Sequence, residues 1–455
     1  MQRFYRAKRL DNLVLVCVGF LILALLALAI VGSQLRRRVS PSPDSCGAAA
    51  LPTAIESILR NHPRGFIALV GDGVPGQTLV TDRPYNTQYA QGYDLYQGVQ
   101  HALTNSMFRT LLAKIGVLLV DDGGNPRCAA AIATVLSQRP ELIAIIGHST
   151  TSCTMAALPT YKKANIPVII PAATNPTLLT RDGEHCFRLP SNDYVQSFVI
   201  ADIIVHKFKA RSVFIIWDAT NEAQQYSEYI KNQVQYFLTA PAPLSLTREE
   251  VPVIEGSYPI SLNPLNYTYL FRRIVSSDAD VVVFAGYGSL AREFLLGLNH
   301  EYAAYPDKRL PKVLLTDGCK IPGIQSYNFD TYITFAAKPL KSFSAFANFD
   351  AGTPIGGFQK MYLTESFEVF GYDAMVILLS AIGEGASRGA LSREQLISLI
   401  GDRTRQYATA YPYEFDGGEN IRNRYYCYSV PKDAIAFAYE ENDLTPMLQR
   451  ASRHQ

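Results

Sequence analysis

The sequence predicts an α/β protein in which two doubly wound parallel-sheet lobes follow a single transmembrane helix. Short apolar runs alternate with helical patterns along most of the chain, which is typical of parallel strands covered on both faces. With 455 residues the chain is longer than one usual domain. An uninterrupted apolar segment near the N-terminus predicts the membrane helix.

The composition is that of an ordinary globular protein. There are 42 Lys and Arg against 40 Asp and Glu, which gives a net charge of +2. This balance excludes a strongly basic nucleic-acid-binding protein and an acidic disordered tail. The 7 cysteines and 7 histidines are too few for a disulfide-built scaffold, and the histidines lack the spacing of a zinc site. We therefore expect no metal, no cofactor and no nucleic-acid partner.

The apolar segment at residues 13–35 is expected to be an uncleaved signal anchor. Leu13 to Val31 is almost wholly aliphatic, and as a helix it spans about 28 Å, close to the hydrocarbon thickness of a bilayer. A signal peptide cut near Val31-Gly32-Ser33 is the alternative, but the run is long and three arginines follow it at 36–38. Basic residues on both sides leave the orientation open.

Eight runs have the length and composition of buried strands. They are Phe66–Val70, Ile115–Val120, Leu142–Ile146, Val168–Ile170, Val213–Trp217, Val281–Ala285, Val313–Thr316 and Tyr332–Phe335. Helical spacing separates several of them, at Tyr93–Thr104, Arg127–Ser137 and Ser197–His206. In such sheets a ligand binds beyond the carboxyl ends of the strands, so the loops there are the candidate site.

Four of these loops carry groups suited to a zwitterion. After Ile146, a run of hydroxyl residues includes Thr151 and Ser152 at a helix start, where N–H groups and hydroxyls can bind an anion. Helix capping is the alternative reading, although it needs only one hydroxyl. The next loop adds small Ala172 and hydroxyl-bearing Thr174. Two later loops add an aromatic ring and an acid for an amine, Tyr287 and Asp317.

Residues 146–161, followed by IPVIIPAATNP at 166–176, resemble the leucine/isoleucine/valine-binding protein family. These are type I periplasmic binding proteins, the amino-acid receptors of ABC importers. The resemblance runs from about residue 66 to about residue 430 and includes Phe187-Arg188-Leu189 and Gly371-Tyr372-Asp373-Ala374. It implies the type I periplasmic-binding-protein fold, with two lobes joined by a hinge.

The resemblance also implies roles for single residues. The hydroxyl that binds the ligand carboxylate falls on Thr151, with Ser152 beside it, and Thr174 adds a hydroxyl and an amide. The carbonyl that accepts from the ammonium falls on Ala172. In the opposite lobe the aromatic falls on Tyr287, and the acid falls on Asp317, one methylene shorter than the Glu often found in the family.

The expected domain boundaries follow from the anchor and the resemblance. They are 1–12 for an N-terminal arm, 13–35 for the anchor, 36–64 for a linker with a short helix, 65–189 and 326–412 for lobe I, 190–325 and 413–445 for lobe II, and 446–455 for a tail. Outside the anchor, Cys46, Cys128, Cys153, Cys186, Cys319 and Cys427 permit up to three bridges, of which Cys128–Cys153 is preferred.

From these features we expect a protein that captures an amino acid or similar small ligand and has no enzymatic activity. It is expected to be extracytoplasmic and tethered to the membrane by a single pass, with ABC permease subunits as partners. Two alternatives remain: a receptor domain that passes lobe closure to a signalling partner, and a nicotinamide-dependent oxidoreductase. The second rests on Gly71–Gly76, which fits G-x-G-x-x-G but lacks the helix that should follow. His148 near Cys153 could suggest a nucleophile, but no orienting third group is apparent in the sequence.

Overall fold

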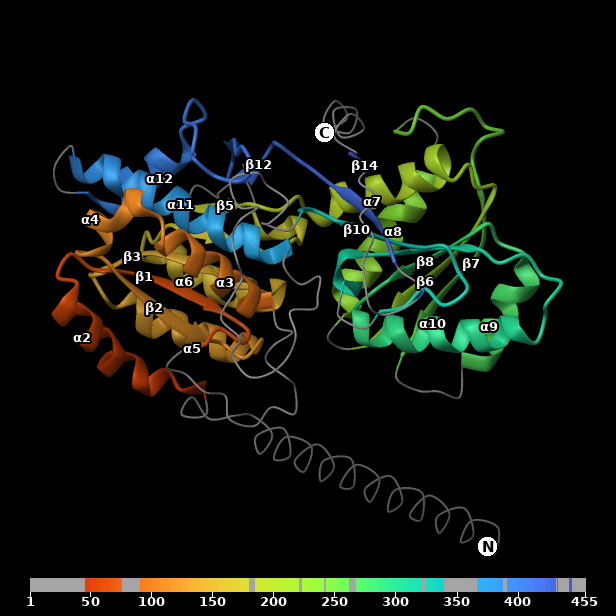
Figure 1. The fold of residues 1–455 in the computed structure, drawn as a ribbon, viewed down its shortest axis with the longest axis horizontal. Helices are drawn as coiled ribbons and strands as arrows, with labels where there is room; N and C mark the ends of the chain where they lie inside the picture. Colours follow the sequence, from red (N-terminus) through yellow and green to blue (C-terminus); the bar gives the residue numbers. More distant parts are fainter. Residues whose placement is uncertain are drawn as a thin grey trace, which may run out of the picture.

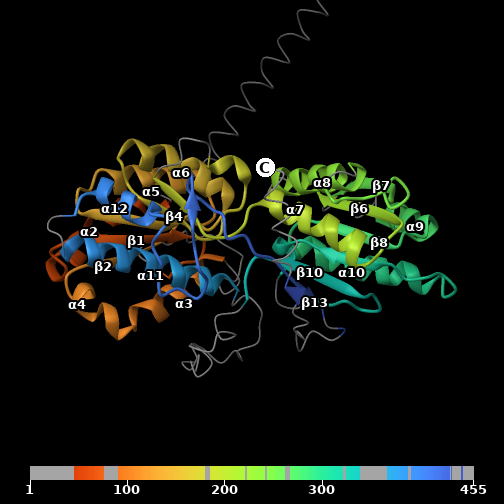
Figure 2. The same cartoon turned by 90° about the horizontal axis from the view of Figure 1, so that it is seen from above.

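Two α/β lobes lie side by side in a computed structural model of the chain (Figures 1 and 2). Each lobe contains a seven-stranded sheet. The structure describes residues 46–75, 91–179, 185–220, 223–240, 243–261, 267–320, 324–338, 366–387, 391–430, 432 and 442–443. The predicted membrane segment at 13–35 lies outside these residues.

The first lobe takes its elements from two stretches of the chain. They are α2 (Leu51–Asn61), β1 (Phe66–Gly71), α3 (Gln91–Leu103), α4 (Arg109–Leu112), β2 (Gly116–Asp121), α5 (Pro126–Ser137), β3 (Leu142–Gly147), α6 (Thr151–Lys163), β4 (Val168–Ile170) and β5 (Cys186–Arg188), and later α11 (Ser366–Ser387), α12 (Arg393–Gly401), β11 (Phe415–Asp416) and β12 (Glu419–Asn420). The strand order is β11-β12-β5-β4-β3-β1-β2.

The second lobe follows β5 and receives two short strands from the C-terminal part. Its elements are α7 (Asp193–Asp202), β6 (Ser212–Asp218), α8 (Gln224–Thr239), β7 (Val253–Ile260), α9 (Tyr267–Ser277), β8 (Val281–Ala285), α10 (Gly288–Ala303), β9 (Lys312–Leu315), β10 (Thr331–Phe335), β13 (Tyr426–Ser429) and β14 (Asn442–Asp443). The strand order is β14-β13-β10-β9-β8-β6-β7.

All eight predicted strands are present, as β1 to β4, β6, β8, β9 and β10. They are continuous apolar runs because helices cover both faces of each sheet. In β1, Ile67 and Leu69 belong to the cluster that includes α3 and α11, whereas Phe66, Ala68 and Val70 belong to the cluster that includes α5 and α6. The strands that sequence analysis missed are mostly two to four residues long, and β7 is a partly exposed edge strand without an apolar pattern.

The longest apolar helix of the described residues is part of the first lobe's core. Residues Phe367–Ser387 of α11 are long and apolar enough to cross a membrane, but 78% of the most apolar window is buried inside the protein. α11 packs closely on α3 because glycines stand at the contact. A Cβ on Gly98 would lie 1.8 Å from the carbonyl oxygen of Glu368. The helix is therefore held by its neighbours in the lobe.

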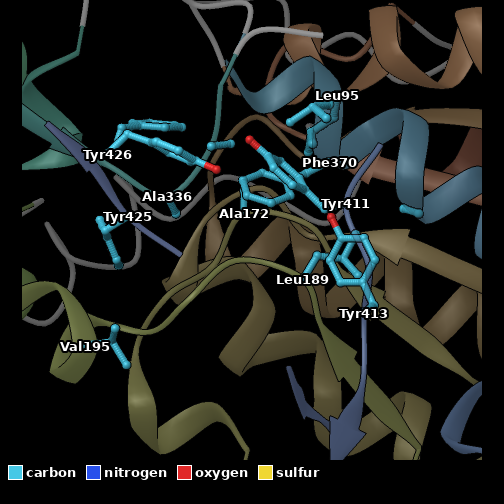
Figure 3. Packing of buried hydrophobic residues seen from close by; sticks show 14 of the residues in the cluster. Leu95, Ala172, Leu189, Val195, Ala336, Phe370, Tyr411, Tyr413, Tyr425 and Tyr426 are labelled. Carbon is cyan, nitrogen blue, oxygen red and sulfur yellow. The ribbon is translucent and has the colours of Figure 1, made fainter. Parts of the chain in front are cut away.

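The chain passes between the sheets at places that differ from the expected boundaries at 326 and 413. β10 pairs in parallel with β9, with Tyr332 opposite Leu314, and so belongs to the second sheet. β12 pairs with β5 through Glu419 and Arg188, and so belongs to the first. The crossings therefore follow β5, β10 and β12. Side chains near them form one apolar cluster, shown in part in Figure 3.

The disulfide joins Cys46 to Cys128, so the preferred pairing of Cys128 with Cys153 is wrong. That pairing assumed that the helices after β2 and β3 follow adjacent strands. In the sheet β1 lies between β2 and β3, and the start of α5 packs against the segment that leads into α2. Cys153 is buried and free, as are Cys186, Cys319 and Cys427. The bridge ties the first described residues to the first lobe.

Candidate functional site

The hydroxyl run after β3 divides into capping residues and exposed residues. Thr150 is the N-cap of α6, and its Oγ1 accepts from the backbone N–H of Cys153 at 3.3 Å. The Ser149 hydroxyl is buried and accepts from the N–H of Asp72 at 2.9 Å, which joins this loop to the loop after β1. Thr151 and Ser152 remain on the accessible first turn of the helix. Part of the run is thus capping chemistry; Thr151 is half-buried, and the hydroxyl of exposed Ser152 lies 3.4 Å from that of Thr150.

The loop after β4 is held from two sides. Ala172 and Ala173 are buried, and the carbonyl oxygen of Thr174 accepts from the N–H of Asp193 at 3.0 Å. The buried guanidinium of Arg188 donates through Nη1 to the carbonyl oxygen of Asn175 at 2.6 Å. Because β3 and β4 are adjacent and parallel, this loop and the start of α6 lie at the same edge of the sheet.

In the second lobe, Asp317 and Tyr287 are linked through a third side chain, Tyr226. The Tyr226 hydroxyl donates to Asp317 Oδ1, and the N–H of Gly318 donates to the same oxygen at 2.8 Å. The rings of Tyr226 and Tyr287 are parallel within 4°, with centroids 5.5 Å apart. Tyr287 is 37% exposed. The structure therefore brings together the two site residues predicted for this lobe.

Asp193, which sequence analysis missed, connects the two lobes. It begins α7 directly after the crossing from β5, and Asn192 caps that helix by accepting from the N–H of Val195 at 3.2 Å. Its backbone bonds to Thr174 of the first lobe, while its carboxyl interacts electrostatically with Asp317 of the second. In the sequence, Asn-Asp before a helix indicates only a capped start, so no signal distinguished Asp193.

Burial dominates the electrostatics of these acids. Burial and, after it, the nearby carboxyl of Asp317 raise the pKa of Asp193 to about 7, although a hydrogen bond from Thr174 and the charge of Arg188 oppose this. Burial also raises the pKa of Asp317, although hydrogen bonds from Tyr226 and Gln196 oppose this. Removal of a carboxylate from water favours its neutral form, and so does a second carboxylate nearby. A positively charged partner would act in the opposite direction and favour the ionised form of both acids.

The structure gives His148 the third group that the sequence did not reveal, but not the geometry of a nucleophilic site. His148 is buried, with Nδ1 2.6 Å from Asp122 Oδ2 and Nε2 3.2 Å from the Tyr161 hydroxyl. The second ring nitrogen thus faces a phenol and not Cys153. Burial raises the pKa of the Cys153 thiol, so it is not a reactive thiolate. This trio supports the loop after β3.

The described residues also bear on two other kinds of site, a dinucleotide-binding loop and a metal site. The residues after Gly71 form a turn at 72–73, whereas α3 begins only at Gln91, so no helix opens within 72–75 as a dinucleotide fold requires. Gly76 lies outside the described residues. Among the residues that the structure describes, no group of three or more His, Cys, Asp and Glu side chains is arranged to hold a metal ion.

Comparisons with known proteins agree with the geometry. Residues 113–299 match the family model described as periplasmic binding protein. An amino acid binding protein of Pseudomonas aeruginosa is 31% identical over 173 residues, which are 38% of this chain and 43% of the relative. A Leu/Ile/Val-binding protein of Escherichia coli K12 is 28% identical over 174 residues, 38% of this chain and 44% of the relative. The matches thus cover less than half of the length of these relatives.

Solved structures are similar over most of the chain. A leucine-binding protein from Thermotoga maritima has a TM-score of 0.59 at 18% identity, over 82% of this chain and 98% of that one. A branched-chain amino acid transporter substrate-binding protein from Streptococcus pneumoniae, in complex with isoleucine, has a TM-score of 0.61 at 17% identity, over 83% and 99%. The chain thus has the type I periplasmic-binding-protein fold, and its matched segment is homologous to the leucine/isoleucine/valine-binding protein family.

Proposed function

We propose that the chain is an extracytoplasmic solute-binding protein that captures an amino acid or similar small ligand between its lobes. The observation that carries this proposal is the position of Asp193, which bonds to the Thr174 loop of one lobe and interacts with Asp317 of the other. Polar groups of both lobes therefore lie within reach of one small molecule at the crossing.

The chemistry of the two sides suits opposite ends of a zwitterion. The Thr151 and Ser152 hydroxyls, with the N–H groups of the first turn of α6, would donate to the ligand carboxylate. The Thr174 hydroxyl would add to the carboxylate site, and the ammonium would donate to the carbonyl oxygen of Ala172 and to Asp317. Charge-assisted hydrogen bonds of this kind are stronger than neutral ones. Only a closed state makes both sets of contacts, so the ligand would favour closure.

The membrane anchor and the partner are part of the same proposal. The apolar segment at residues 13–35 would tether the lobes to the outer side of the cell membrane, and ABC permease subunits would receive the ligand. The names of the relatives, which are binding and transport proteins, favour this output. A receptor that passes closure to a signalling partner is the second candidate. Copurification with permease subunits rather than with a kinase would favour transport.

Substitution of Asp317 tests the binding site directly. Asp317→Ala removes the carboxylate that pairs with the ligand amine and should weaken L-leucine binding by about 2–5 kcal/mol, whereas Thr151→Ala should cost less. Titration calorimetry of the full chain measures both. Asp330→Ala is the matched control, because that carboxylate of the second lobe is exposed and pairs with Lys312 at its surface. Unchanged affinity in Asp317→Ala would refute the assignment.

A further inference from the structure

Three carboxyl groups surround the stacked pair Tyr226 and Tyr287, and we name them the acidic trio. Asp317 accepts from the Tyr226 hydroxyl, and Asp218 Oδ2 accepts from the N–H of Tyr287 at 3.4 Å. Asp193 and Asp317 both act on the Tyr226 phenol, after burial, to raise its pKa. The trio therefore places three acids of different elements around one aromatic pair.

Two buried polar atoms at this place have no hydrogen-bond partner among the residues that the structure describes. Asp193 is 1% exposed, and its Oδ1 is unpaired. Tyr425 is 0% exposed, and its hydroxyl is unpaired too. Burial raises the pKa of that phenol first, and Asp317 and Asp193 add to the effect, so the hydroxyl lies near both acids. Buried polar groups are normally paired, and unmade bonds of this kind indicate a missing partner.

The positive charges around the trio are already engaged. Arg188 is the basic group that acts on Asp193, but its guanidinium bonds to Glu419 and to the carbonyl oxygen of Asn175. Lys320, which follows Asp317 closely in the chain, lies 4.3 Å from the ring centroid of Phe335 and 4.9 Å from that of Tyr428. Among the described residues, the two cations beside the trio thus already have partners, and a cationic ligand would balance the acids in their ionised form.

We propose that the acidic trio makes the site select an amine ligand of net positive charge over a zwitterion of the same shape. The ammonium of a zwitterion can pair with one of the acids, but the ligand as a whole carries no net charge. An added positive charge, or the loss of the carboxylate, leaves a net charge for the remaining acids. This inference rests on the proposed function, since it refines the ligand class of the same site.

Matched ligand pairs separate the two sources of net charge. L-lysine and L-norleucine differ by the side-chain amine, and L-leucinamide and L-leucine differ by the ionised carboxylate. We expect titration calorimetry of the full chain at pH 7.5 to give an affinity on the order of tenfold higher for the cationic member of at least one pair. The pair that responds identifies whether a second amine or the missing carboxylate supplies the charge.

Variants assign the preference to the trio. Asp193→Asn keeps the side-chain shape and should reduce the preference to about threefold or less. Asp202→Asn is the control, a buried acid at the far end of α7 that pairs with His206 at 3.0 Å, and it should keep the wild-type preference. Melting temperatures verify that both variants fold, and the wild-type comparison needs no variant.

The outcomes separate this inference from the proposed function. If L-leucine and L-norleucine bind the wild-type chain as tightly as L-leucinamide and L-lysine do, the charge preference is wrong while amino-acid capture stands. If none of the four compounds binds, amino-acid capture fails and the preference fails with it. An equal loss of preference in Asp193→Asn and Asp202→Asn would also overturn the role of the trio.

Discussion

The two lobes hold their polar groups in different ways. In the first lobe, the loop after β3 is backed by a buried network, in which His148 lies between Asp122 and Tyr161. In the second lobe, Asp317 is half-buried and bonds to Tyr226, and the Tyr287 ring is 37% exposed. A buried network thus supports the loop of the first lobe, whereas the polar groups of the second lobe bond to one another near the protein surface.

Because of this difference, we expect the two lobes to contribute to ligand binding in different ways. A loop whose backbone is already fixed loses little conformational entropy when a ligand arrives. Asp317 and Tyr226, which bond to each other, must exchange that bond for one to the ligand. This exchange lowers the affinity and makes it depend on the charge of the ligand. We therefore expect the first lobe to supply a preformed half-site and the second lobe to supply discrimination.

The largest expected effect comes from breaking the network behind the first loop. His148→Ala removes the imidazole that bonds to the buried Oδ2 of Asp122, while Oδ1 still accepts from the N–H of Gly124. Such losses lower the free energy of unfolding by about 3–5 kcal/mol. Chemical denaturation of the full chain measures it.

The matched control is His206→Ala in the second lobe. His206 also pairs with an acid, Asp202, but its side chain is 40% exposed. Water can enter where the exposed ring stood, although Asp202 itself is only 3% exposed, so the stability should fall by less than in His148→Ala, by about 1–2 kcal/mol. Equal losses in the two variants would mean that the network does not distinguish the lobes.

The pH dependence of stability tests the crossing between the lobes. Burial raises the pKa of Asp193 from 3.8 to about 7, and that of Asp373 to about 7 as well. Between these values the folded chain holds protons that the unfolded chain has lost. The free energy of unfolding of the ligand-free chain should therefore fall as pH rises from about 4 to about 7, by up to about 4 kcal/mol for each group.

Asp193→Asn should remove the part of this pH dependence of the free energy of unfolding that Asp193 causes and leave the part that Asp373 causes. Thermal unfolding between pH 4.5 and pH 8 measures both proteins. Because a raised carboxyl pKa gives stability at low pH that is lost as the pH rises, the two curves should differ in slope between about pH 4 and pH 7 and lie furthest apart above pH 7. Parallel curves across this range would show that Asp193 is not the titrating group.

The smallest effect separates capping from binding within the hydroxyl run. Thr150→Ala removes the cap of α6 and should cost about 1 kcal/mol of stability. Thr151→Ala leaves the cap intact, so it should change the stability by much less while weakening L-leucine binding. Melting temperatures and calorimetry of the two variants provide the comparison. A cap-like loss of stability in Thr151→Ala would reverse the assignment.

Much of the fold was predictable because strands buried on both faces leave continuous apolar runs, as in Val281–Ala285. The candidate hydroxyls and the acid also stood out, since such groups at strand ends are visible in the sequence, but their role in binding stays a prediction. The disulfide and Asp193 were not predictable in this way. Cys46 reaches Cys128 across 82 positions, and Asp193 resembles an ordinary helix start.

The sequence by itself determined the strands, most of the helices and the polar loops, because local composition and periodicity report which faces are buried. Only the tertiary structure decided which sheet each short strand joins, which thiols meet, and which acids lie beside Tyr226. Those outcomes depend on contacts between segments far apart in the chain, separated by 82 positions for Cys46 and Cys128 and by 231 for Arg188 and Glu419. No local pattern records such contacts, since packing of the whole chain selects them.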